Sequence, residues 1–566
     1  MIQRFSPAIH AALLSLLCAV LYFPYLGSAP FFDKGEPREA MAVQDIVRRG
    51  EWLVPLKRAT DVPSKPPLFH WSAAAAYHVT GRLDEATIRL PSAIYATLGV
   101  VLIYLLARKL FNAETALYAG AILATTLVYQ DQALDARVDM TLCFFVMLSL
   151  ALFYSLYRGF LNHPFWYYLF FVVTGIGTLA KGPLGILLPA LVAGAFVLAK
   201  RKWDLLAKFI FHPGIILMLA LAAGWYVIAV TRGGEGFFDR QILQENLSRF
   251  AGGSGHSHPI YYYIPYLFSQ ALPWGLLLPV VLWDSFKKGA PSGDNTLFLK
   301  IWFAVMFVFF SIALGKRPVY LLPLYAALAI LMAQWFVGHN GAAGGGSYYY
   351  RAVALLAGFT GVILLLIVAG ELWNHDPGLL FGPIEQLLKP KDRANFVVIK
   401  NELASFGWPF TMAALFSALL WFSLARCLWV HRMRAAAPRL VLIAVVFSFA
   451  ARGLVVPKIA EAKSYRPFMI EVNRLVGPEH KLYLYGASFN SDQVVFYRGG
   501  PLETLDLAAE EIAAKIGRGD AYSIMAEKDW LDLRKFNPNL PPPLLKSTGK
   551  GPEGDAPLVL VRAEGL

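Results

Sequence analysis

Long apolar stretches alternate with short polar segments along most of this chain. Each stretch approaches the roughly 20 residues that a helix needs to cross a bilayer. A helix that is apolar on all sides needs lipid or other helices around it. The pattern predicts an α-helical polytopic membrane protein with about thirteen transmembrane helices, near residues 8–26, 88–107, 115–130, 140–157, 165–180, 183–199, 209–230, 261–283, 297–314, 319–337, 352–370, 409–430 and 439–456.

Composition supports a membrane protein over a large soluble one. Of the 566 residues, 57% are hydrophobic and only 16% are charged, whereas soluble domains carry roughly 25% charged residues. One larger core does not explain this deficit, because soluble cores stop growing beyond about 250–300 residues. The three cysteines, Cys18, Cys143 and Cys427, lie inside apolar stretches. They offer neither a disulfide framework nor a CxxC metal motif.

The distribution of charge predicts the orientation. The net charge is +13, and short basic loops recur on one side of the predicted bundle, including 108–109, 200–202 and 287–288. Basic flanks of this kind mark the cytoplasmic side, so they report topology and do not indicate a nucleic-acid partner. The N-terminus is then cytoplasmic and the loops 27–87, 131–139 and 231–260 lie outside. A cleaved signal peptide is the alternative interpretation of the first apolar stretch, residues 8–26. The length of that stretch and the position of Pro30 favour a retained membrane helix.

The C-terminal tail, residues 457–566, has a different pattern. Segments 481–485, 494–497, 522–525 and 558–561 read as strands, and 507–516 reads as an amphipathic helix. We therefore expect two domains, a transmembrane domain over 1–456 and a small soluble α/β domain over 457–566. An odd number of spans places the tail outside the membrane, in the periplasm of a bacterial inner-membrane protein. A lid or a docking surface is favoured over an independent enzyme.

The first outside loop carries dense charge. Residues 33–39 contain three carboxylates and two cations directly after a membrane helix. Pro37 fits the first turn of a helix, which would place Asp33 and Glu36 at its entrance near the membrane surface. Solubilising charge and helix-dipole pairing are the alternative roles for these acids.

Two further groups of charged residues lie on the same outer side of the membrane. Lys65 precedes two prolines, which hold the chain extended, so it presents a cation at headgroup depth or is part of a stiffened turn. The second outside loop holds three aspartates, of which Asp139 begins an apolar span. A carboxylate there favours the helix N-terminus, but ionisable groups at the edge of the membrane core are functional candidates.

Other outside cations run against the positive-inside trend. They are Lys181, Lys316 and Arg317, and an anionic phosphate outside the membrane would explain them. His256 and His258 are two residues apart before a tyrosine-rich segment. They form either a surface pair or part of a metal site.

Taken in order, these motifs resemble one family. Gly50-Glu51-Trp52, Lys65-Pro66-Pro67, Ala136-Arg137-Val138-Asp139-Met140, Lys181-Gly182-Pro183 and Gly315-Lys316-Arg317-Pro318-Val319-Tyr320 are similar to motifs of the polytopic lipid-linked sugar transferases. That family includes aminoarabinose lipid A transferase and the protein O-mannosyltransferases. The resemblance spans roughly 25–340 and implies the GT-C fold, with transfer of a sugar from a polyprenyl phosphate to an acceptor outside the membrane.

The resemblance also assigns residues. It matches Asp139 to the family's second-loop aspartate, Lys65 to its Lys-Pro-Pro lysine and Arg38 to its first-loop arginine. The family's histidine before the tyrosine-rich helix best matches His256. Two positions depart from the pattern: the first-loop aspartate falls on Gly35, and the carboxylate before Lys-Pro-Pro is Ser64. The identity of the first acid, and the presence of a divalent metal, are therefore left open.

The functional hypothesis is a membrane glycosyltransferase. Lys65, Arg38, Lys181, Lys316 and Arg317 would stabilise the charge on the departing phosphate. Asp139, or else Glu36 or Asp33, would take the proton of a hydroxyl acceptor, whereas a phosphate acceptor needs no base. A single displacement predicts inversion, and the acceptor is a lipid, a glycan or a protein. The alternatives are a polyprenyl-lipid flippase or transporter and a non-catalytic assembly subunit.

Overall fold

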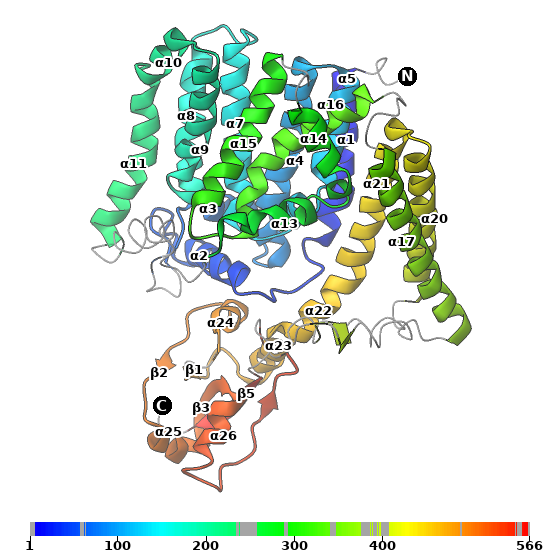
Figure 1. The fold of residues 1–566 in the computed structure, drawn as a ribbon. Helices are drawn as coiled ribbons and strands as arrows, with labels where there is room; N and C mark the ends of the chain where they lie inside the picture. Colours follow the sequence, from blue (N-terminus) through cyan, green and yellow to red (C-terminus); the bar gives the residue numbers. More distant parts are fainter. Residues whose placement is uncertain are drawn as a thin grey trace.

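The structure is a computed structural model in which long helices stand side by side and a small sheet domain hangs from one end (Figure 1). It describes residues 6–56, 64–233, 257–287, 293–339, 347–374, 407–486, 489–549 and 557–563, together with a few isolated positions. The predicted fold class, a polytopic helical protein with a small C-terminal α/β part, is confirmed.

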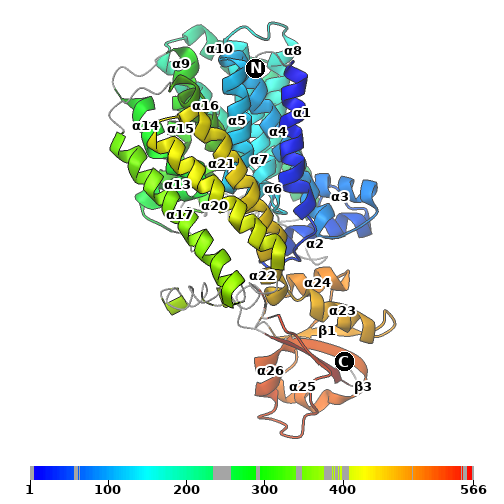
Figure 2. The same cartoon turned by 90° about the vertical axis from the view of Figure 1, so that its right-hand side faces the viewer.

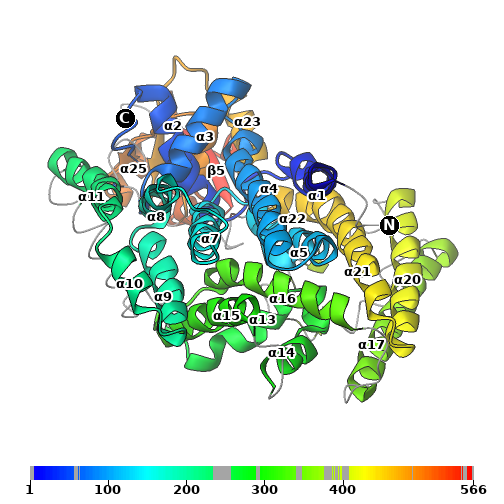
Figure 3. The same cartoon turned by 90° about the horizontal axis from the view of Figure 1, so that it is seen from above.

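Nine helices among these described residues are long and apolar enough to cross a membrane. They are α1 (Pro7–Tyr22) with the 3-10 turn after it, α4 (Glu85–Leu110), α7 (Val138–Tyr157), α11 (Gly214–Gly233), α15 (Asp294–Ile312), α16 (Tyr325–Gly338) with the 3-10 turn before it, α17 (Ser347–Asn374), α20 (Gly407–Trp429) and α21 (Met433–Ser448) with the helical turns that follow it to Lys463. Two shorter apolar helices, α8 (Phe165–Lys181) and α9 (Leu184–Ala199), stand among them. Seen from above, α17 and α20 lie at the periphery beside α21 (Figure 3).

Two of the thirteen predicted spans are not continuous helices. Segment 115–130 divides into α5 (Ala113–Thr125) and α6 (Leu127–Ala133). Segment 261–283 divides into α13 (Tyr263–Gln270) and α14 (Leu278–Phe286) around Pro273, which lacks the N–H that a continuing helix needs. In Figure 1, α13 lies across the end of the bundle near α3. The predicted count of thirteen is therefore not confirmed.

The first outside loop forms two helices, α2 (Gly35–Arg49) and α3 (Leu68–Thr80), at the end of the bundle. Asp33 Oδ1 accepts hydrogen bonds from the N–H groups of Gly35 and Glu36 at 3.0 and 2.9 Å, which satisfies donors that a helix start leaves unpaired. Gly50 ends α2 with a φ of 68°, a conformation that glycine adopts without strain. The helix predicted around Pro37 is confirmed.

The tail folds as a five-stranded sheet in the order β2-β1-β3-β5-β4. Its elements are α23 (Arg466–Leu475), β1 (Leu482–Tyr485), α24 (Asp492–Arg498), β2 (Thr504–Leu505), α25 (Ala509–Lys515), β3 (Ile516–Ala526), α26 (Glu527–Leu533), β4 (Leu545–Lys546) and β5 (Leu558–Ala563). β1 pairs in parallel with β2 and β3, whereas β5 is antiparallel to β3 and β4. Three predicted strands and the predicted helix are confirmed.

The strand predicted over 494–497 is wrong, because these residues belong to α24. Val494 and Phe496 are buried in a hydrophobic cluster that also contains Val43 and Ile46 of α2. Gln44 Nε2 donates to the Phe496 carbonyl at 3.1 Å. Packing against α2 therefore overrides the strand preference of this β-branched and aromatic run.

The tail is joined to the bundle in two ways. A helical stretch of 31 residues, Met433–Lys463, runs out of the bundle toward the tail (Figure 2). In addition, the Tyr497 hydroxyl accepts from the Phe31 N–H at 2.9 Å and donates to Glu85 Oε1 at 2.8 Å. The tail thus holds the chain segment that leads into α2.

We predict that Tyr497→Phe lowers the midpoint of thermal unfolding of the purified protein. The variant removes a bond to a carboxylate, worth about 1.5–3 kcal/mol, and leaves the Phe31 N–H without its acceptor. Tyr348→Phe is the matched control, because Tyr348 is 85% exposed on α17. Equal midpoints for the two variants would contradict the assigned role of Tyr497.

Candidate functional site

Charged side chains from five separate segments meet at the end of the bundle beside α2. They line a narrow, open pocket. We call it the cationic pocket; its charged lining residues are Arg38, Glu39, Lys65, Arg137, Asp139, Lys181 and Arg317. Four predicted phosphate-binding cations and the predicted aspartate are thus brought together, although up to 279 residues separate them in the sequence.

The centre of the pocket is the ion pair between Asp139 and Lys181, whose side chains are 11% and 10% exposed. Asp139 lies in the first turn of α7, and Lys181 is the last residue of α8. Gly182, with a φ of 71°, ends α8 and leaves the lysine at its tip. The Lys181 ammonium also lies 4.5 Å from the ring centroid of Tyr320, within the range of a cation–π contact.

Arg38 is held in place by two residues that the sequence analysis did not single out. Glu39 Oε1 accepts from Arg38 Nε at 3.1 Å and from Nη2 at 2.8 Å, and Glu39 Oε2 lies 2.9 Å from His70 Nε2. Both partners are buried. Burial alone would raise the pKa of Glu39, but Arg38 and His70 hold that pKa well below its usual range. Glu39 is therefore ionised and fixes the guanidinium at the pocket wall.

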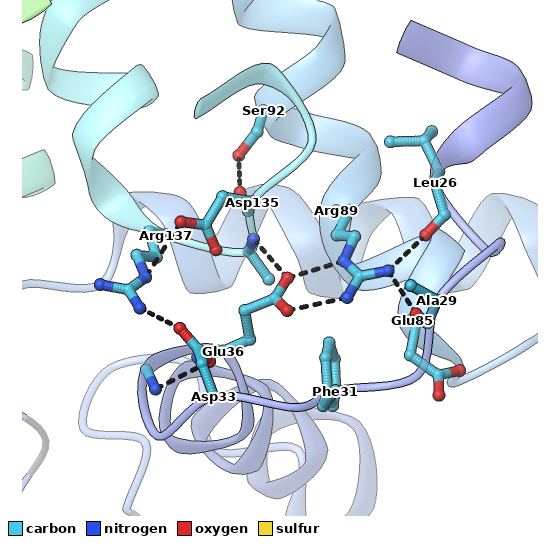
Figure 4. A network of polar contacts seen from close by, with 12 residues as sticks. Leu26, Ala29, Phe31, Asp33, Glu36, Glu85, Arg89, Ser92, Asp135 and Arg137 are labelled. Atoms are coloured by element: carbon cyan, nitrogen blue, oxygen red, sulfur yellow. Dashed lines mark hydrogen bonds and ion pairs between the residues drawn. The ribbon is translucent and has the colours of Figure 1, made fainter. Parts of the chain in front are cut away.

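Glu36 does not line the cationic pocket but forms a buried ion pair with Arg89 of α4 (Figure 4). Arg89 Nε and Nη2 donate to its two oxygens at 2.6 and 2.7 Å, and the Ala136 N–H donates to Oε1 at 3.0 Å. Arg89 Nη1 donates to the carbonyls of Leu26 and Ala29. Both carboxylate oxygens are thus engaged, which is the arrangement of a structural residue.

Asp33 does not line the cationic pocket but pairs with Arg137, which does. Its Oδ1 caps α2, and its Oδ2 pairs with the Arg137 guanidinium (Figure 4). A Cβ added to Gly35 would lie 2.3 Å from Arg137 Nη2. The guanidinium therefore covers the position onto which the resemblance places the family's first-loop aspartate. Arg137 was not predicted as a site residue, although it stands within the motif around Asp139.

Asp135 completes this wall. Its Oδ2 lies 3.1 Å from Arg137 Nε, and its carbonyl accepts from Ser92 Oγ at 2.7 Å. Burial raises the pKa of Asp135 to about 8, against the opposing effect of Arg137 and with further help from Glu36 and Asp33. Asp135 and Asp33 thus both contact the Arg137 guanidinium and hold it in place before α7.

Lys316 and Arg317 are adjacent but have different environments. Arg317 lines the pocket, and the buried Tyr263 of α13 donates to its carbonyl at 3.1 Å. Lys316 is buried, and its ammonium donates to the carbonyls of His258 and Ala313. Its contacts tie together the two loops that carry it and His258, so the structure separates Lys316 from the other predicted cations.

The predicted metal finds no support in the part of the chain that the structure describes. No group of three or more His, Cys, Asp or Glu side chains able to hold a metal ion occurs there. The pocket carboxylates Glu39 and Asp139 instead pair with Arg38 and Lys181. His256 lies outside the described residues. We derive no catalytic step through a metal.

A family of dolichyl-phosphate-mannose-protein mannosyltransferases matches residues 64–228. The undecaprenyl phosphate-alpha-4-amino-4-deoxy-L-arabinose arabinosyl transferase of Pseudomonas aeruginosa is 31% identical over 383 residues, 65% of this chain and 68% of the relative. An uncharacterized protein of Aquifex aeolicus is 25% identical over 513 residues, 90% and 91% of the two chains.

A solved structure shares the fold. It is ArnT from Cupriavidus metallidurans bound to undecaprenyl phosphate, with a TM-score of 0.75 and 21% identity over 97% of each chain. These comparisons confirm the resemblance on which the expected fold was based.

We predict that Glu36→Gln lowers the free energy of unfolding by about 3–5 kcal/mol, because the buried Arg89 loses its charged partner. Thermal unfolding of the purified protein measures this loss. Glu471→Gln is the control: Glu471 is 52% exposed and lies 3.8 Å from Arg474, and such surface pairs contribute about 0–1 kcal/mol. A Glu36 variant as stable as this control would refute the structural role.

Proposed function

Because this chain belongs to the GT-C family of membrane glycosyltransferases, we propose that it takes a sugar from a polyprenyl-phosphate donor bound in the cationic pocket. The observation that carries the proposal is the convergence of five cations around Asp139 at the end of a membrane bundle. The acceptor is a lipid, a glycan or a protein that reaches the same pocket.

The cations suit a departing phosphate. When the bond between the sugar's anomeric carbon and the phosphate oxygen breaks, the bond's electrons stay on that oxygen and the phosphate gains negative charge. Preorganised donors stabilise such charge, and removal of one typically costs about 10²–10³ in rate. Arg38 offers a planar guanidinium that Glu39 already orients, so little reorganisation is needed as the charge develops.

Asp139 is the proposed base for a hydroxyl acceptor. Among the described lining residues the carboxylates are Asp139 and Glu39. Both oxygens of Glu39 are engaged, Oε1 by Arg38 and Oε2 by His70, whereas the ion pair of Asp139 with Lys181 uses Oδ1. The acceptor oxygen forms the new bond to the anomeric carbon while its proton passes to Asp139. A single displacement of this kind inverts the anomeric centre. A phosphate acceptor needs no base, and Asp139 then positions Lys181.

We predict that Asp139→Asn lowers transfer at least about 10²-fold, the lower limit for loss of a general base. Purified protein is incubated with a labelled polyprenyl-phosphate sugar and an extract of membrane lipids and envelope glycans, and labelled product is counted. Asp294→Asn is the control, because Asp294 forms a partly exposed ion pair with Lys200 elsewhere in the bundle. Full activity in Asp139→Asn would contradict the proposal, as would product with retained configuration.

The proposal places the pocket and the tail on the periplasmic side of the inner membrane. Residue 82 is exposed just after α3, which lies at the same end of the bundle as α2, whereas residue 202 is exposed before α10 (Trp203–Ile210) at the other end. The native cysteines are buried, so an added cysteine dominates labelling.

In intact cells we expect a membrane-impermeant maleimide to label Arg82→Cys. Lys202→Cys should react only after the inner membrane is permeabilised. The reverse pattern would place the pocket in the cytoplasm and overturn the proposed orientation.

A further inference from the structure

We infer that an anionic phospholipid binds in an apolar groove between α8, α9, α10 and α11, with one acyl chain inside the groove and its phosphate at the cations around α10. We call this cavity the α10 groove. It opens beside α10, at the end of the bundle opposite α2 and the cationic pocket (Figure 1). The inference is therefore independent of the proposed function, because the lipid is held there and not transformed.

The α10 groove has the chemistry of a site for a hydrocarbon chain. It has a volume of about 220 Å³, and the described residues that line it are all apolar except Thr174. The Thr174 hydroxyl already donates to the Phe170 carbonyl at 2.7 Å within α8. An apolar space of this kind offers water too few hydrogen-bond partners to hold it, whereas an acyl chain gains by leaving water for it.

Gly194 of α9 marks unfilled space in the groove. It lines the groove, and a Cβ added there would meet no atom within 4 Å. Nearer the other end of α9 the packing is tight, since a Cβ added to Gly185 would lie 2.2 Å from the carbonyl carbon of Gly177 in α8. Helices α8 and α9 are thus in close contact toward the cationic pocket and leave open space toward α10.

Helix α10 has the features of a helix that lies at a membrane surface. Leu206, Phe209 and Ile210 share one face by their spacing of three and four residues, and all three line the groove. Trp203 and Phe211, at the two ends of the helix, are 60% and 81% exposed. Exposed aromatic residues are enriched where lipid headgroups meet the hydrocarbon. The mouth of the groove is therefore at headgroup depth.

The mouth of the groove carries a surplus of positive charge. Four cations stand within nine residues there, namely Lys200, Arg201, Lys202 and Lys208. Asp294, which pairs with Lys200 at 2.7 Å, and Asp204 of α10 offset two of these charges, so that two remain. The N–H groups of Arg201 and Lys202 donate to the carbonyls of Leu198 and Val197 at 3.0 and 3.1 Å, which fixes the turn that carries them.

The groove and the cations together identify the occupant. The positive-inside rule alone would explain the cations, but it would leave the open space beside Gly194 unexplained. The groove alone would accept the chain of any lipid. A Lys or Arg near the membrane surface attracts anionic lipids, so a phospholipid with a net negative headgroup satisfies both features.

The first test compares two lipids with the same acyl chains. Dioleoyl phosphatidylglycerol or dioleoyl phosphatidylethanolamine is titrated against the purified full-length protein, and native mass spectrometry measures the affinity of the first lipid bound. We expect phosphatidylglycerol to bind at least about five-fold more tightly, which is the contribution of roughly one surface cation. Equal affinities would overturn the assignment of an anionic lipid.

Two variants locate the site. Gly194→Leu fills the groove and should weaken both lipids at least ten-fold, whereas Gly358→Leu on α17, where an added Cβ also meets nothing within 4 Å, should not. The double variant Arg201→Gln with Lys202→Gln should bring phosphatidylglycerol down to the affinity of phosphatidylethanolamine. Its control is Arg432→Gln with Arg434→Gln, two exposed cations at the start of α21. Variants that behave like their controls would refute the site.

A smaller substitution keeps the test decisive if Gly194→Leu does not fold. Gly194→Cys adds one thiol inside the groove, and the native cysteines are buried. Phosphatidylglycerol should slow the reaction of this thiol with a lipid-soluble maleimide more than phosphatidylethanolamine does. No protection by phosphatidylglycerol would overturn the inference. Stronger protection by undecaprenyl phosphate would also overturn it, because the groove would then hold an isoprenoid chain. None of these readouts depends on sugar transfer.

Discussion

The buried ion pair between Glu36 and Arg89 is the constraint on which the rest of the site depends. Arg89 projects from a membrane helix, where an unpaired charge is costly, and it is neutralised by a residue of the first outside loop. Its remaining donors bind the carbonyls of Leu26 and Ala29, and Glu36 also accepts the N–H of Ala136. One charge pair thus joins the end of α1, the start of α2, α4 and the turn before α7.

Because the Glu36–Arg89 pair joins these four segments, it also fixes the positions of the charged side chains next to them. Arg137 follows the pinned Ala136 and covers Gly35, while Arg38 follows Glu36 by two residues in α2 and faces the pocket. The acidic residues therefore fall into two groups with different structural positions. Glu36 and Asp33 hold backbone and guanidinium groups in position, and Asp139 stands among the cations of the pocket. Fixed donors of this kind are what a preorganised site requires.

The C-terminal domain belongs to the same framework. Its helix α24 shares a hydrophobic cluster with α2, and Tyr497 binds both the segment before α2 and Glu85 at the start of α4. The helix that carries Arg38 is consequently packed on membrane helices at one face and on the soluble domain at another. The contacts of this domain therefore help to fix the helix that forms part of the pocket wall.

The sequence by itself determined the elements whose signal is local. Apolar length predicts membrane helices, Pro37 predicts the first turn of α2, and alternation predicts three strands of the tail, because each depends on neighbouring residues alone. Tertiary structure decided the breaks within 115–130 and 261–283, the helical state of α24, and which acids form buried structural pairs and which line the pocket. These depend on partners far apart in the chain: Glu36 and Arg89 are 53 residues apart, and no local pattern encodes that they meet.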